Sequence, residues 1–250
     1  MRMRMLFYWR FTLMSKKGYF STGEKLLWSI SAAAVLLSFA LFGGGTLLTP
    51  VASLVGVTSL IYNAKGNPFG QLLMVLFSLM YGVISWQERY YGEMITYLGM
   101  TMPMAVFALI SWLRNPFGGN RAEVTVNRIR RGEWGLLCLL TLAVTVLFFL
   151  ILRAFETQQL FFSSLSVTTS FLAVYLTWRR SPFFAVAYAA NDAVLIVLWC
   201  LAAVHDQSCL SVVVCFAAFL ANDIYGYLSW RRMAKRQAAA VEGVTVWPEK

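Results

Sequence analysis

Long apolar segments separated by short polar breaks form the pattern of this chain. Each apolar segment has about 20 residues, which is the length that an α-helix needs to cross a bilayer. Ser21 and Glu24 have the spacing of a capping box just before the first segment and predict a helix start there. The pattern predicts an all-α membrane protein with eight transmembrane helices, at about 25–43, 46–63, 69–87, 91–113, 134–153, 158–178, 182–204 and 208–230.

The composition supports a membrane protein and excludes an ordinary soluble domain. Of the 250 residues 59% are hydrophobic and only 13% are charged, which is too little charge to cover a soluble surface. The net charge of +10 would suit a nucleic-acid-binding protein, but its distribution gives another explanation. With a cytoplasmic N-terminus and eight spans, all Lys and Arg residues except Arg89 and Arg153 lie in cytoplasmic segments. This is the positive-inside pattern, so we expect both termini in the cytoplasm and no nucleic-acid partner.

A weak internal repeat divides the spans. Pro68 and Pro182 match at the first turn of its two units, Trp86 and Trp199 follow at similar distances, and Trp112 and Trp230 close the units. Parallel repeats of three helices joined by a linker helix are typical of transporters that bind substrate between their halves. We therefore expect a basic and aromatic cytoplasmic segment at 1–24, an extra transmembrane helix at 25–44, a first three-helix bundle at 45–114, a cytoplasmic loop and linker helix at 115–157, a second bundle at 158–232 and a cytoplasmic tail at 233–250.

Two Asn-Asp pairs lie inside the last two apolar segments. A carboxylate at the centre of a bilayer costs about 2.5 to 3.5 kcal/mol, so it usually faces a polar cavity or a partner. Aromatic residues at helical spacing accompany both pairs. The pattern favours a substrate pocket built from Tyr188, Asn191, Asp192, Trp199, Asn222, Asp223, Tyr225 and Trp230. The alternative is that these side chains only bond between helices, where each contributes about 0.6 kcal/mol.

In the first repeat, Trp86 and Gln87 are further candidate substrate contacts, near the outward-facing edge of the bilayer. Interfacial aromatic residues are common at that depth, so a membrane belt is the alternative for Trp86. No Walker motif, HExxH or GxSxG sequence is present, and His205 is the only histidine. We expect no enzyme activity, no cofactor and no metal site. An intramembrane enzyme and a substrate-binding subunit of an energised transporter remain distant alternatives.

The segments AYAANDAVLIVLW (187–199) and ANDIYGYLSWRR (221–232) resemble the PnuC family of vitamin-precursor transporters over roughly residues 45–232. The resemblance implies duplicated three-helix bundles of SWEET-like architecture. It implies uptake of nicotinamide riboside for NAD biosynthesis across the bacterial inner membrane by facilitated diffusion, with cytosolic phosphorylation trapping the substrate. Relatives carry thiamine or riboflavin, which stay open as alternatives. The partners it implies are a small vitamin-like molecule and the lipid bilayer, and a homo-oligomer is possible. The site residues it implies are Trp86, Gln87, Asn191, Asp192, Trp199, Asn222, Tyr225 and Trp230.

Overall fold

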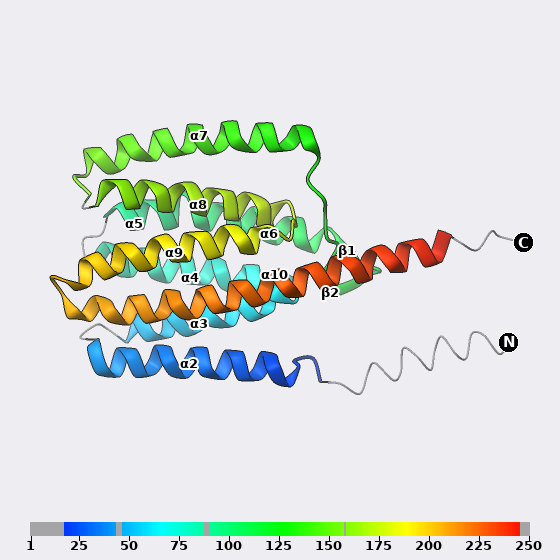
Figure 1. Ribbon diagram of the computed structural model, residues 1–250, viewed down its shortest axis with the longest axis horizontal. Helices are drawn as coiled ribbons and strands as arrows, with labels where there is room; N and C mark the ends of the chain where they lie inside the picture. The colour runs from blue at the N-terminus through cyan, green and yellow to red at the C-terminus, as the bar shows by residue number, and fades with distance from the viewer. Residues whose placement is uncertain (1–17, 44–46, 88–90, 158, 246–250) are drawn as a thin grey trace, which may run out of the picture.

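The computed structural model describes residues 18–43, 47–87, 91–157 and 159–245. They form a bundle of helices that lie side by side along the long axis, with one small hairpin at the end where α10 leaves the bundle (Figure 1). The elements in chain order are α2 (Thr22–Phe42), α3 (Leu48–Ala64), α4 (Pro68–Gln87), α5 (Tyr91–Thr96), the π-helix η1 (Tyr97–Thr101), α6 (Met102–Leu113), β1 (Pro116–Phe117), β2 (Asn120–Val124), α7 (Arg131–Ala154), α8 (Leu160–Trp178), α9 (Phe184–Ala203), the 3-10 helix η2 (Gln207–Cys209) and α10 (Leu210–Thr245).

The predicted all-α membrane fold is confirmed. Seven helical segments in the described part of the chain are long and apolar enough to cross a membrane, with α5, η1 and α6 together making one of them. The remaining predicted span, at 46–63, corresponds to α3, which has 17 residues and is shorter than the others. The predicted capping box also exists, since Ser21 Oγ accepts from Glu24 N at 3.2 Å and the Glu24 carboxylate accepts from Ser21 N at 2.7 Å.

The helices contact one another in two matching sets. Helix α3 packs on α4 and α4 on α6, while α8 packs on α9 and α9 on α10. The two sets then meet through α3 against α10 and through α8 against α6. These are the contacts that two parallel three-helix units related by a two-fold axis would make. They support the predicted 3+1+3 arrangement, which remains a prediction.

The turns that open α4 and α9 have the same local structure. Gly66 and Arg180 both adopt left-handed backbone conformations, with φ of 66° and 57°. The next residue in each turn donates its N–H back to the helix before it, from Asn67 to Tyr62 O and from Ser181 to Leu176 O. This is the Schellman type of helix end, followed in both units by a proline, which is the first residue of α4 in one unit and lies two residues before α9 in the other. The similarity reaches the level of individual hydrogen bonds.

The structure departs from the expected spans at three places. The π-helix η1 interrupts the fourth span just before Pro103, whose ring lacks an N–H and crowds the preceding turn. Strands β1 and β2 form a hairpin inside the segment that we expected to be a cytoplasmic loop. Helix α10 continues to Thr245, well past the expected end near 230, because charged and Ala-rich sequence favours a helix outside the membrane too.

Candidate functional site

A small cavity of about 40 Å³ lies between the two sets of helices. Helices α3, α4, α8, α9 and α10 contribute to it, together with the π-helix η1. The cavity is large enough for only one to three water molecules. Its lining residues are Leu60, Met74, Phe77, Tyr97, Thr101, Ser170, Val174, Tyr188, Asn191, Asp192, Phe216, Phe219 and Asp223. We call this space the central cavity.

Asn191 is the best-anchored polar side chain of the central cavity. It is buried, and its Oδ1 atom accepts hydrogen bonds from three hydroxyl groups of α8, those of Ser166 at 3.3 Å, Thr169 at 2.9 Å and Ser170 at 3.0 Å. These donors fix the orientation of the amide, so its Nδ2 group is the side that can donate. The hydroxyl-rich face of α8 therefore serves to position one amide at the cavity.

Two carboxyl groups face the same cavity. Asp192 on α9 and Asp223 on α10 are both buried and lie within hydrogen-bonding reach of one another. The Oδ2 atom of Asp192 has no hydrogen-bond partner among the described residues. Two buried carboxylates in contact would repel each other if both were ionised, and an unpaired acceptor in a membrane interior is costly. The pair can be satisfied by a proton, by a cation or by the hydroxyl groups of a ligand.

A larger pocket of about 420 Å³ opens at the end of the bundle where α7 ends and α8 begins. The carboxylates of Glu93 and Glu156 line this space, and Trp199 forms part of its wall. We call it the outer pocket, after the membrane side on which the expected topology places it. Ser166 also lines it and donates to Asn191, which lines the central cavity. The Ser166–Asn191 hydrogen bond thus joins the lining of the outer pocket to the lining of the central cavity.

Aromatic side chains close the opposite side of the central cavity. Trp112 and Trp230 are both fully buried, with ring centroids 5.3 Å apart. Phe184 stacks edge-on against Trp230 at 4.9 Å and lies 6.2 Å from the cavity residue Tyr188. This aromatic seal, made by Trp112, Phe184 and Trp230, fills the space between the central cavity and the end of the bundle where α2 begins.

The structure brings together four of the residues that the sequence proposed for substrate contact. Tyr188, Asn191, Asp192 and Asp223 all line the central cavity. Trp199 lies apart from them in the outer pocket. The exposed side chains at the end of α4, Trp86 and Gln87, line neither space, and Trp230 belongs to the aromatic seal.

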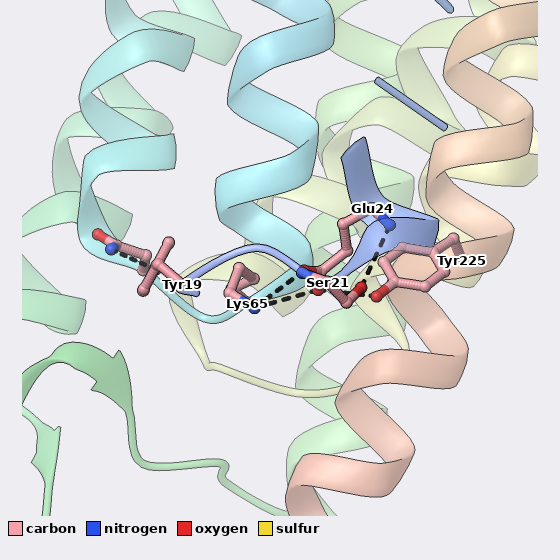
Figure 2. Close-up of polar contacts among 6 residues, drawn as sticks. Tyr19, Ser21, Glu24, Lys65 and Tyr225 are labelled. Carbon is pink, nitrogen blue, oxygen red and sulfur yellow. Dashed lines mark hydrogen bonds and ion pairs between the residues drawn. The ribbon is translucent and has the colours of Figure 1, made fainter. Parts of the chain in front are cut away.

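The remaining two predicted residues face α2 instead of the central cavity. Asn222 donates from Nδ2 to Ser31 Oγ at 2.9 Å, and the Tyr225 hydroxyl donates to Glu24 at 2.8 Å. On a helix, Asn222 and Asp223 point about 100° apart, and here Asp223 lines the cavity while Asn222 bonds α2. Figure 2 shows Tyr225 beside Glu24, which also pairs with Lys65 at 3.1 Å.

The sequence reasoning did not single out several residues of the central cavity. Phe77, Tyr97, Thr101 and Phe219 contribute rings and a hydroxyl to its wall. Tyr97 and Thr101 lie in the π-helix, and π-helical turns are frequent at functional sites. Pro103 shortly after them was the available signal, because a proline inside an apolar segment predicts a distorted helix.

The chain was compared with known proteins. The family model described as "Nicotinamide mononucleotide transporter" matches residues 46–232. The nicotinamide riboside transporter PnuC of Neisseria mucosa is 20% identical over 221 residues, which cover 87% of this chain and 84% of that protein. The nicotinamide riboside transporter PnuC of Haemophilus influenzae is 22% identical over 190 residues, which cover 76% of this chain and 81% of that protein.

A solved structure shows the same fold. The crystal structure of the vitamin B3 transporter PnuC superposes with a TM-score of 0.76 at 20% identity, covering 88% of this chain and 95% of that one. The expected resemblance is thereby confirmed, and the family model spans well over half of the sequence. The chain belongs to the PnuC family of nicotinamide mononucleotide transporters.

Proposed function

We propose that this protein carries nicotinamide riboside across the bacterial inner membrane by facilitated diffusion, with both termini in the cytoplasm. The observation that carries the proposal is the central cavity, where Asn191, Asp192 and Asp223 meet aromatic rings between two matching helix sets. Substrate sites of transporters built from parallel repeats lie at this place. Cytosolic phosphorylation would then trap the substrate, so that uptake needs no energy source in the carrier itself.

The charge of the lining favours the riboside over the phosphorylated mononucleotide. Among the described residues that line the outer pocket and the central cavity, four are acidic and none is Lys or Arg. A phosphate group would meet repulsion along this route, whereas the positively charged pyridinium ring of nicotinamide riboside would be attracted. Tyr97, Phe77 and Tyr188 provide rings for stacking and cation–π contact with that pyridinium.

The polar groups of the central cavity match the remaining parts of the substrate. The Asn191 amide can bond the carboxamide, and the Asp192 and Asp223 carboxyl groups can accept from ribose hydroxyls. A cavity of about 40 Å³ cannot hold a nucleoside, so binding requires the two helix sets to separate. We infer that substrate enters from the outer pocket and leaves after the aromatic seal opens, as in alternating access.

Uptake of radiolabelled nicotinamide riboside into membrane vesicles tests the proposal. Asn191→Ala should reduce uptake by about tenfold or more, since it removes an anchored polar contact in the cavity. Thr145→Ala is the matched control, because Thr145 bonds Thr168 at 2.9 Å between α7 and α8 and lines neither pocket. Unchanged uptake by Asn191→Ala would refute the assigned site. Competition by unlabelled thiamine or riboflavin decides between these vitamins and the riboside.

A further inference from the structure

A cavity with a basic lining lies outside the proposed transport route. It has a volume of about 540 Å³, and its lining includes residues at the start of α7 and on the part of α10 that leaves the bundle (Figure 1). One wall is a stripe on α10 made by Tyr227, Arg231 and Lys235, which are spaced by four residues and share one helix face. The opposite wall includes Trp134 and Phe183. We call this space the basic pocket.

The charge of the basic pocket is opposite to that of the transport route. Arg128, Arg231 and Lys235 line it, and none of the described lining residues is acidic. Ion pairs elsewhere at this end occupy Lys65, Arg179 and Arg236, but no ion pair in the described part of the chain involves the three basic residues of the pocket. Three cations gathered without counter-ions attract an anion.

The aromatic residues give the pocket an apolar floor. Trp134 and Phe183 meet edge to face at 6.1 Å, and Phe183 lies 6.3 Å from Tyr227. The Arg231 guanidinium lies 5.7 Å from the centre of the Tyr227 ring, so the cation is held above the aromatic surface. A ligand with an anionic head beside apolar atoms would match both parts.

Hydrogen bonds hold the wall that carries Arg128 in place. Gln237 of α10 accepts from Val126 N at 2.8 Å, which ties the segment after β2 to the long helix. On the other side, Asn127 donates from N to Arg180 O at 3.0 Å and from Nδ2 to Arg179 O at 3.1 Å. The segment after β2 is therefore hydrogen-bonded both to α10 and to the turn between α8 and α9. One wall of the pocket is thus held by main-chain contacts as well as by side chains.

We propose that the basic pocket binds a phosphate-bearing anion, with Arg128, Arg231 and Lys235 holding the phosphate. Basic pockets between transmembrane helices on the cytoplasmic side commonly bind anionic lipid headgroups. The exposed Trp134 and Phe183 rings lie beside the phosphate position, where the glycerol and upper acyl chain of a lipid would lie. An inner-leaflet phospholipid and free phosphate share the required chemistry. This site is separate from the proposed transport route and does not depend on it.

Native mass spectrometry of the full chain in detergent tests the lipid source, with dioleoylphosphatidylglycerol and zwitterionic dioleoylphosphatidylcholine as probes. Arg231→Gln combined with Lys235→Gln should weaken phosphatidylglycerol binding by about tenfold or more, because each basic residue near a membrane surface contributes to anionic-lipid attraction. The control is Arg114→Gln combined with Arg121→Gln, which removes the same charge from exposed positions outside the pocket. The charge-preserving pair Arg231→Lys and Lys235→Arg should bind like the wild type.

A second arm tests free phosphate by titrating inorganic phosphate at constant ionic strength and following tryptophan fluorescence. Selective loss of phosphatidylglycerol binding in the pocket variant supports the proposal and identifies a membrane lipid as the source of the bound phosphate group. Selective loss of inorganic phosphate binding supports it and names a soluble ligand. Equal affinities of the wild type, pocket variant and control for both probes, or equal losses in the pocket variant and control, would overturn it.

Discussion

Two tryptophan residues cross between the helix sets at equivalent positions. Trp112 donates its indole N–H to Thr177 O at 2.9 Å, and Trp230 donates to Asn63 O at 2.7 Å. Each acceptor lies five residues before the proline at or near the start of the next helix of its own unit. The two bonds are therefore equivalent: one runs from α6 of the first helix set to α8 of the second, and the other runs from α10 of the second set to α3 of the first. Together they stabilise the closed arrangement of the aromatic seal.

Replacing either indole by a phenyl ring should destabilise the protein to a similar extent. Trp112→Phe and Trp230→Phe each remove one of two donors to a buried carbonyl, which keeps its main-chain bond from Arg180 N or Gly66 N. The lost indole hydrogen bond should cost about 0.5 to 1.5 kcal/mol. Thermal unfolding in detergent measures the effect, and the partly exposed Trp178 provides the control variant Trp178→Phe. Equal unfolding temperatures for all three variants would contradict the assigned bonds.

At the residue scale, the sequence identified the buried polar residues of the site, but it could not predict which of them face the central cavity and which face α2. Buried Asn and Asp residues in apolar segments predicted a polar site, and Asn191, Asp192 and Asp223 do line a cavity. Asn222 and Tyr225 belong to the same spans but face Ser31 and Glu24 of α2. Direction depends on which helix packs against each face, and periodicity alone does not contain that information.

At the scale of elements, α2 and α7 are attached in similar ways to the two helix sets. Glu24 near the start of α2 pairs with Lys65 at the end of α3, and Glu133 near the start of α7 pairs with Arg179 at the end of α8. The Arg179 side chain forms a bidentate contact, since its Nη2 atom also donates to Glu133 at 2.8 Å. Hydrogen bonding to Glu133 raises the pKa of Arg179 above its ordinary value, so this pair stays charged throughout the physiological range.

A double-mutant cycle on Glu24 and Lys65 should reveal a direct coupling. Glu24→Gln also weakens the bond from the Tyr225 hydroxyl, so the single variant should lose about 1.5 to 3 kcal/mol of unfolding free energy. Lys65→Gln should lose less, and the double variant should fall short of the sum by about 0.5 kcal/mol or more. Strict additivity in the cycle, measured by denaturant unfolding in detergent, would show that the ion pair does not attach α2.

The contact between α3 and α4 depends on a glycine. A Cβ atom on Gly70 would lie 2.3 Å from Asn63 Oδ1 and 2.7 Å from the Asn63 main-chain nitrogen. Gly70→Ala should therefore force the two helices apart and cost on the order of 1 to 3 kcal/mol. Gly135→Ala in α7 is the matched control, because no atom lies within 4 Å of its added Cβ. A Gly70→Ala protein as stable as that control would refute the close packing.

At the scale of the whole molecule, apolar length and charge distribution were enough to predict a helical membrane protein, and the comparison with a solved fold confirms that class. Those signals depend on the bilayer, which imposes the same length on every span. They did not predict the π-helix or the extension of α10, for which the local signals are Pro103 and the charged, Ala-rich sequence after residue 230. They did not predict the hairpin either, because Val124 N donates to Gly66 O and the hairpin depends on such contacts between segments distant in sequence. The positions of Phe77, Tyr97 and Phe219 in the central cavity depend on such contacts too.

A binding titration of nicotinamide riboside against the purified protein in detergent tests the central cavity most directly. We predict that the wild type and the Thr145→Ala control bind with similar affinity, and that Asn191→Ala binds about tenfold or more weakly. Asp192→Asn together with Asp223→Asn should weaken binding as well, because it replaces one acceptor oxygen of each carboxyl group by a donor and removes the negative charge that we assign to the cation. Unchanged affinity in both cavity variants, with the same folded state by size-exclusion chromatography, would contradict the account.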